Sequence, residues 1–198
     1  MRIFNIFLLC LLLACGTASA ANARKHYTNE WYCFRTDRLH LGAERPVGIT
    51  PEMAGHGMSF AYTPSCFTAP EGACSFIAAY ASYVADEEGY YNEQWYEDLD
   101  NIFLKKGWHL DSHYSTKTDG LLWYVSTFSR KTQGRRVEAM NFQARTLITA
   151  PFGEADSPIE YNIRAVFPKS KARTMRPLVK QMFNSFRHTE PCHSRNRK

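Results

Sequence analysis

Apolar residues alternate with polar ones over several stretches of the chain, which is the pattern of half-buried β-strands. Near the N-terminus this pattern predicts an extended segment over residues 31–41 and a short strand over residues 58–62. Residues 75–85 are apolar almost throughout, which is typical of a central strand covered on both faces. Asp119-Gly120 is a hairpin signal, so we expect an antiparallel meander. Its four strands are predicted over residues 108–116, 121–128, 136–149 and 160–167.

A helical period replaces this alternation in two places. Residues 92–106 are predicted to form a helix that ends at Gly107 and places four apolar residues on one face, namely Trp95, Leu99, Ile102 and Phe103. A second helix is predicted near the C-terminus, with Pro177 in its first turn. The apolar stripe of this helix comprises Met175, Leu178, Val179, Met182, Phe183 and Phe186.

These elements predict an α+β fold in which an antiparallel β-sheet meander is sandwiched with two main helices. The chain has 198 residues, of which 44% are hydrophobic and 22% charged, and this composition excludes a disordered chain and a polytopic membrane protein. We expect a single α+β domain over residues 31–187, preceded by an N-terminal segment over residues 21–30. A basic tail over residues 188–198 contains Cys192.

Residues 1–20 have the features of a signal peptide. Met1-Arg2 supplies the positive charge, an apolar run follows over residues 3–14, and Ala18-Ser19-Ala20 is a small-x-small cleavage site. Residues 12–15 also have the form of a lipobox, in which Cys15 would be lipidated; the alternative is an ordinary apolar segment that contains a cysteine. Both interpretations predict export to the periplasm, as a soluble protein or as one tethered to the membrane by lipid.

Four cysteines follow the predicted leader, and an even number of cysteines in an oxidising compartment indicates disulfides. Three connectivities are open to Cys33, Cys66, Cys74 and Cys192. Cys66 and Cys74 flank a turn-rich loop that a local bridge would close. We therefore expect these two to pair with each other and Cys33 to pair with Cys192.

One short pattern has the residue types of a metal or acid–base site. On a strand, His109, Asp111 and His113 would project from one face and converge on a cation. A half-solvated strand produces the same alternation, and zinc sites draw ligands from more than one segment, so we favour no metal. The chain also lacks a Gly-x-Ser-x-Gly nucleophile motif and a phosphate-binding glycine motif. We therefore expect neither an enzyme nor a bound cofactor.

The net charge of +5 is too small to indicate nucleic-acid binding, but the charges are unevenly distributed. Acidic residues gather over residues 86–88 and on the first predicted helix, and basic residues gather over residues 169–176 and in the tail. Opposed charges of this kind steer and orient a protein partner, although each cluster could equally be an ordinary solvated surface. The candidate partner-binding residues are a basic hairpin tip and an aromatic pair, namely Arg130, Lys131, Arg135, Arg136, Tyr90 and Tyr91.

The order of these elements, with Met182-Phe183-Asn184-Ser185-Phe186 closing the second helix, resembles the PsbP-like fold. That fold recurs in small exported bacterial lipoproteins and binding domains. The chain is also similar to periplasmic immunity proteins that neutralise type VI secretion effectors, especially lipase toxins. Some of these open with an aromatic-cysteine pair before an amphipathic strand, as Tyr32-Cys33 precedes Leu39-His40-Leu41 here. The resemblance implies a protein partner, namely a secreted toxin.

Three functional hypotheses follow from the sequence. The leading one is a non-enzymatic exported protein-binding module that acts as an immunity protein. The second is a periplasmic small-ligand or lipid-binding lipoprotein, which would need an apolar cavity between the sheet and a helix. The third is a metal-dependent hydrolase that uses His109, Asp111 and His113.

Overall fold

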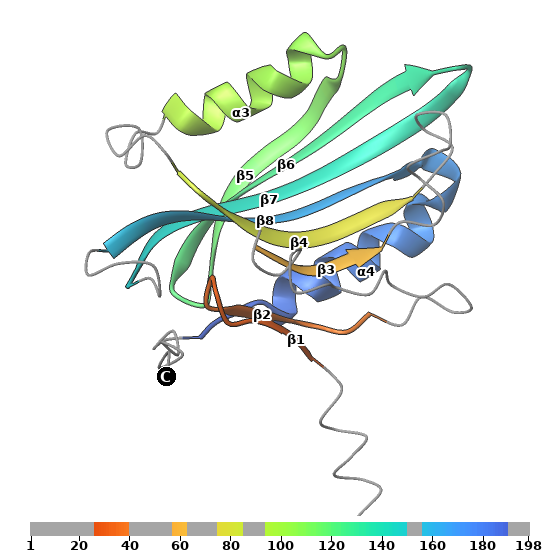
Figure 1. The fold of residues 1–198 in the computed structure, drawn as a ribbon. Coiled ribbons are helices and arrows are strands. Elements are labelled where there is room, and N and C mark those ends of the chain that lie inside the picture. The colour runs from red at the N-terminus through yellow and green to blue at the C-terminus, as the bar shows by residue number, and fades with distance from the viewer. Residues whose placement is uncertain (1–25, 40–56, 63–74, 85–93, 150–155, 190–198) are drawn as a thin grey trace, which may run out of the picture.

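A six-stranded antiparallel sheet forms the body of the molecule (Figure 1). This computed structural model describes residues 26–39, 57–62, 75–84, 94–149 and 156–189. From one edge of the sheet to the other, the strands are β3 (Met58–Tyr62), β4 (Phe76–Tyr83), β8 (Asp156–Pro168), β7 (Arg135–Thr149), β6 (Leu121–Thr132) and β5 (His109–Thr118). The antiparallel α+β class is confirmed, and β4 lies inside the sheet between β3 and β8.

Two-residue turns join β5 to β6 and β6 to β7. Asp119 and Gly120 have φ values of 55° and 77°, and Gln133 and Gly134 have values of 46° and 74°. Positive φ at both central positions is the mark of the type I′ turn, whose twist matches that of the flanking strands. The predicted turn at Asp119-Gly120 is confirmed, and Gln133-Gly134 forms a second tight hairpin turn.

A second, three-stranded sheet is formed by β1 (His26–Asn29), β2 (Phe34–Asp37) and β9 (Arg187–His188), with β2 in the middle. The prediction of one extended segment over residues 31–41 is therefore wrong at its start. The side chain of Asn29 accepts hydrogen bonds of 3.0 Å from the backbone N–H groups of Trp31 and Tyr32, which turns the chain before β2. The sequence predicts no element for the N-terminal segment over residues 21–30, where β1 lies, or for the tail over residues 188–198, which β9 enters at His188.

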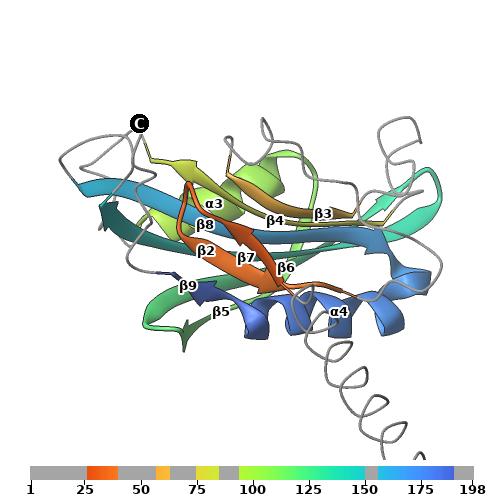
Figure 2. The same ribbon diagram turned by 60° about the horizontal axis from the view of Figure 1, so that its bottom comes forward.

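The two helices cover opposite faces of the six-stranded sheet (Figures 1 and 2). α3 (Gln94–Lys105) contacts β5 and β6, whereas α4 (Ala172–Ser185) contacts β7 and β8 and is also packed against β2. Both predicted helices are confirmed. Pro177, however, lies inside α4 rather than in its first turn, because the helix already begins at Ala172 after the 3₁₀ turn η2 (Lys169–Lys171). No helix in the described part of the chain is long and apolar enough to cross a membrane.

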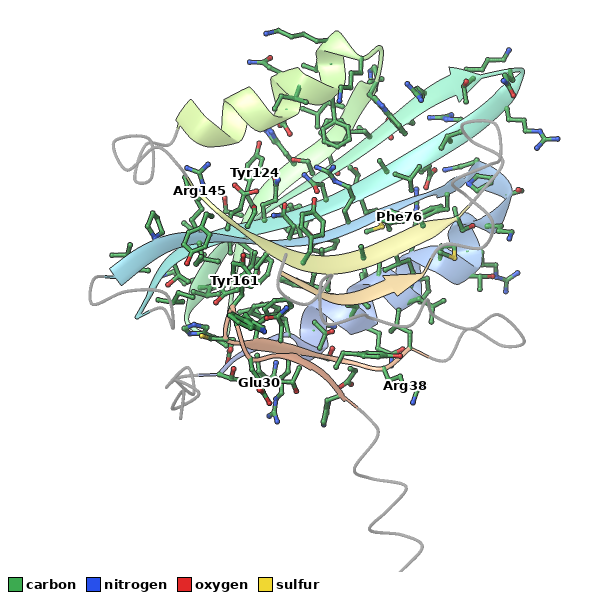
Figure 3. The ribbon with its side chains drawn as sticks, in the orientation of Figure 1. Glu30, Arg38, Phe76, Tyr124, Arg145 and Tyr161 are labelled. Atoms are coloured by element: carbon green, nitrogen blue, oxygen red, sulfur yellow. The ribbon has the colours of Figure 1, made fainter. Side chains whose placement is uncertain are left out.

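The main core lies between the six-stranded sheet, α4 and the second sheet. Aromatic rings fill this space: the ring centroids of Trp123 and Phe186 are 4.8 Å apart, and those of Phe142 and Phe183 are 4.7 Å apart. The buried Tyr161 hydroxyl donates a 2.7 Å hydrogen bond to the carbonyl oxygen of Tyr32 and so ties the two sheets together. Figure 3 shows Tyr161 on this side of the sheet and Tyr124 on the side of α3.

The apolar face predicted for α3 is only partly correct. Phe103 stacks on Phe128 with ring centroids 4.3 Å apart and also meets the edge of Trp108. Ile102 is half exposed, so its predicted place in the buried stripe is wrong. The side chains of Trp95 and Leu99 lie outside the described residues. Asp100 is buried instead, because it lies one turn before Phe103 on the inner side of the helix.

Candidate protein-binding surface

The β6–β7 hairpin carries four cationic side chains at its tip. Lys131 lies directly opposite Arg136, and Arg135 follows opposite Thr132. Like charges directly opposite each other across two strands are unfavourable. Among the described residues, Lys131, Arg135 and Arg136 have no carboxylate partner. The predicted basic hairpin tip is therefore present, and described carboxylates do not neutralise the charges of Lys131, Arg135 and Arg136.

The fold brings a second basic segment to the same end of the molecule. Glu138 lies two residues beyond Arg136 on β7 and is almost completely buried. Its carboxylate accepts a 2.9 Å hydrogen bond from Nε of Arg176 and pairs with Lys169, which lie on α4 and η2. Figure 1 shows the hairpin tip and the start of α4 at one end of the sheet. We call this surface the basic end; it comprises Arg130, Lys131, Arg135, Arg136, Lys169, Lys171, Arg173 and Arg176.

Part of the basic end is held in a fixed geometry. The Arg130 guanidinium lies 4.6 Å from the centroid of the Trp108 ring and donates a 3.3 Å hydrogen bond to the carbonyl oxygen of Lys106. Arg136 donates a 3.3 Å hydrogen bond to the hydroxyl of Ser129, which in turn donates to Asp111 at 2.9 Å. Arg130, Arg136 and Ser129 border a groove of about 500 Å³ that Lys131 and His109 also line. An acidic group entering the groove would meet cations that are already oriented.

The candidate metal ligands do not converge. His109 lies opposite Ser129, and His113 lies opposite Ser126, because a β-bulge at Asp111 shifts the register of β5. Residues 126 and 129 of one strand point to opposite faces, so the two histidines do as well. Nδ1 of His109 is 3.3 Å from the Asp111 carboxylate, whereas His113 points toward α3. The predicted shared face of His109, Asp111 and His113 is therefore wrong, and the described residues contain no other cluster with metal-ligand composition.

A buried carboxylate on the α3 side forms a network that the sequence analysis missed. Asp100 accepts hydrogen bonds from the hydroxyls of Tyr124 at 2.9 Å and Ser126 at 2.7 Å, and it lies 3.2 Å from Nδ1 of His113. The Tyr124 hydroxyl is also 2.6 Å from that nitrogen. The signal in the sequence was the position of Asp100 next to Leu99 and one turn before Phe103. Because its oxygens already accept several donors, we interpret Asp100 as the anchor of α3 on the sheet.

Polar side chains continue from this network across the same face of the sheet. Gln143 donates a 3.0 Å hydrogen bond to Asn162, and Arg164 donates a 3.2 Å hydrogen bond to Asn141. The three amide side chains are buried, and these hydrogen bonds offset the loss of water. The two faces of the sheet therefore differ: the α4 side is a closed apolar core, and the α3 side is hydrogen-bonded.

The structure describes only some of the predicted site and disulfide residues. Tyr90, Tyr91, Cys15, Cys66, Cys74 and Cys192 lie outside the described residues. Cys33 is completely buried and disulfide-bonded. Its carbonyl oxygen accepts a 2.8 Å hydrogen bond from the backbone N–H of Thr189, which lies three residues before Cys192 in the sequence. The pairing of Cys33 with Cys192 stays a prediction that this geometry favours.

Comparisons with known proteins relate this chain to others by its fold. No family model and no curated protein matches the sequence. The crystal structure of LpqN from Mycobacterium tuberculosis, described as involved in cell envelope biogenesis, is similar to this chain with a TM-score of 0.51 and 12% sequence identity. The match covers 77% of this chain and 82% of LpqN. This likeness shows a shared fold.

Two further solved structures are similar over comparable lengths. Cyanobacterial PsbP (CyanoP) from Synechocystis has a TM-score of 0.43 and 11% identity, and the match covers 82% of this chain and 91% of that one. The protein of unknown function PA94 from Pseudomonas aeruginosa has a TM-score of 0.43 and 6% identity, with 76% and 88% of the two chains covered.

Proposed function

We propose that this chain is a non-enzymatic, exported protein-binding module whose basic end docks on an acidic surface of a protein partner. The observation that carries this proposal is the gathering of eight cationic side chains, from two segments about 40 residues apart in the sequence, at one end of the sheet. Gathering like charges lowers the stability of the folded chain. A partner of opposite charge would compensate for that cost and would be steered toward this end.

The finer role that we propose is that of a periplasmic immunity protein that neutralises a secreted toxin. The export signal, the resemblance to immunity proteins of type VI secretion and the basic end support this role. The description of LpqN as a protein of cell envelope biogenesis agrees with a place outside the cytoplasm. A toxin with an acidic active-site cleft is the partner that the basic hairpin would fit.

The alternative of a carrier with an apolar cavity has less support. Trp123, Phe142, Phe183 and Phe186 occupy the space between α4 and the sheet where that cavity would lie. The alternative of a metal-dependent hydrolase also has less support. Its candidate metal ligands do not come together, because His113 faces away from His109 and Asp111.

Charge reversal at the hairpin tip tests the proposal. The probe is the candidate toxin, namely the purified secreted protein encoded beside this gene. The variant carries the double change Lys131→Glu and Arg135→Glu. We expect its association rate with the toxin to fall by about tenfold or more at low ionic strength, because both side chains contribute to steering. Lys117→Glu is the control, since Lys117 is an exposed residue at the far end of β5.

The same variants can be tested in living cells. A strain that lacks the gene should be killed by neighbouring wild-type cells, and the wild-type protein or K117E should restore protection while the double variant should not. No complex with the neighbouring secreted protein, together with normal survival of the deletion strain, would refute the immunity role. Equal loss of binding in K117E would refute the assignment of the basic end.

A further inference from the structure

A second groove, remote from the basic hairpin tip, lies between the second half of α4 and the three-stranded sheet. Its volume is about 640 Å³, within the range of small-molecule sites. Cationic side chains reach it from three different elements: Arg35 from β2, Arg187 from β9 and Lys180 from α4. His26 and Asp37 line the same groove, together with the amide side chain of Gln181.

The two arginines form an unfavourable pair in the fold. Arg35 and Arg187 lie directly opposite each other in the register of β2 and β9, so their side chains share one face of the sheet. Like charges in this position repel each other. Among the described residues, Arg35, Arg187 and Lys180 have no carboxylate partner. The fold therefore places three cations around one groove, none of them paired with a carboxylate of the described ranges.

Asp37 could have neutralised them, but its interactions are taken up elsewhere. Its carboxylate lies 2.8 Å from Nδ1 of His26, and its backbone N–H donates a 2.8 Å hydrogen bond to the hydroxyl of Ser185. The contact with His26 holds the acidic side chain against β1. Asp37, the one carboxylate among the described residues that line the groove, is thus engaged with a histidine rather than with the arginines.

Arg187 is also held in place by the end of α4. One of its terminal nitrogens donates to the carbonyl oxygens of Asn184 at 3.0 Å and Phe186 at 2.6 Å. An arginine has five N–H donors, so the donors on its other two nitrogens remain available. A guanidinium fixed in this way loses little side-chain entropy when it binds an anion.

We propose that this groove is an anion site that binds a phosphate group between Arg35, Arg187 and Lys180. Planar guanidinium groups bind phosphate oxygens through paired hydrogen bonds, and a tetrahedral phosphate can accept donors from all three elements at once. A bound phosphate would also remove the repulsion between the two arginines. The site is independent of the basic end and of the proposed protein partner.

Thermal unfolding with matched anions tests the site. Adding inorganic phosphate, against sodium chloride of equal ionic strength, should raise the Tm of the wild-type protein and of Lys117→Gln, which loses an exposed charge elsewhere. Arg35→Gln should abolish most of this rise and weaken phosphate binding measured by calorimetry by about tenfold or more. In chloride alone, R35Q should have a Tm at least as high as the wild type, because it removes the like-charge pair. Lys180→Gln repeats the test without touching the second sheet.

Two further probes identify the source of the phosphate group. Sedimentation with phosphatidylglycerol vesicles that depends on Arg35, and that fails with phosphatidylcholine vesicles, would identify a lipid headgroup. A Tm rise with glycerol phosphate but no vesicle binding would identify a soluble phosphate ester. The proposal is overturned if phosphate gives no rise beyond that of chloride, or if K117Q loses binding as much as R35Q does.

Discussion

The Glu138 carboxylate lies beneath Arg176 and accepts a 2.9 Å hydrogen bond from its Nε, while it also pairs with Lys169. Only the carboxylate is buried; about half of the Arg176 side chain remains exposed. Glu138→Gln should therefore leave two cations without their common partner and lower the free energy of unfolding by about 1–3 kcal/mol. Urea denaturation followed by tryptophan fluorescence measures this loss.

A double-mutant cycle separates the ion pair from other effects of the change. Arg176→Gln alone should cost less than E138Q, because Lys169 still pairs with the buried carboxylate in R176Q. The double variant should be more stable than the sum of the single changes predicts, since the two groups interact. Strictly additive changes would show that Glu138 does not attach α4 to β7 through Arg176.

Asp100→Asn should loosen α3 from the sheet. The amide keeps one acceptor oxygen where the carboxylate offered two to the hydroxyls of Tyr124 and Ser126. We expect a loss of about 1–3 kcal/mol and faster hydrogen exchange over residues 101–105, with little change in α4. Tyr124→Phe should give a smaller effect, and Tyr114→Phe, at an exposed position on β5, should give none.

Alkaline solution should destabilise the fold through buried tyrosines. Burial raises the pKa of Tyr80 above its usual value, with Glu160 adding to the rise and Arg164 opposing it. Burial, together with Tyr83, likewise raises the pKa of Tyr32. The unfolded chain loses these protons near pH 10 while the folded chain still holds them, so the free energy of unfolding falls as the pH rises above about 10.

Chemical denaturation between pH 8 and pH 11 checks this expectation. Tyr80→Phe should make the fall in stability shallower, by up to about 1.4 kcal/mol per pH unit in the range where only the unfolded tyrosine is ionised. Tyr114→Phe serves as the matched change at an exposed site. An unchanged alkaline slope in Y80F would contradict the role of Tyr80.

The predicted bridge between Cys33 and Cys192 should be found by peptide mapping under non-reducing conditions. It would close a loop of about 160 residues, so Cys192→Ser should cost about 5 kcal/mol under the chain-entropy model. Cys74→Ser, which opens the predicted short loop, should cost about 2–3 kcal/mol. A peptide that links Cys33 to Cys66 or Cys74 would contradict the predicted pairing.

Local signals in the sequence predicted the elements whose causes are local. The paired positive φ values at Asp119 and Gly120 follow from an Asp-Gly turn. Five of the six residues of the predicted C-terminal stripe are buried, because a 3.6-residue period leaves them on one side. The same reasoning failed at Asp111, because a β-bulge depends on the partner strand rather than on the residue itself.

Long-range pairing explains most of what the sequence could not predict. Arg187 and His188 form a strand only because β2, about 150 residues earlier, offers a free edge. The basic end likewise joins segments that are separate in the sequence, and Glu138 gave no sign of being the buried group that connects them. Predictions from one sequence thus identified the charged clusters, while their combination required the fold.

The three-stranded sheet contains the first and the last strands of the described chain, on either side of β2. During synthesis, β9 can reach β2 only after the roughly 150 residues between them have left the ribosome. Closure of this sheet is therefore a late step with a large sequence separation, which is slow compared with hairpin formation. A nascent or truncated chain that stops before Arg187 would expose the edge of β2 and would be a preferred substrate for chaperones and proteases.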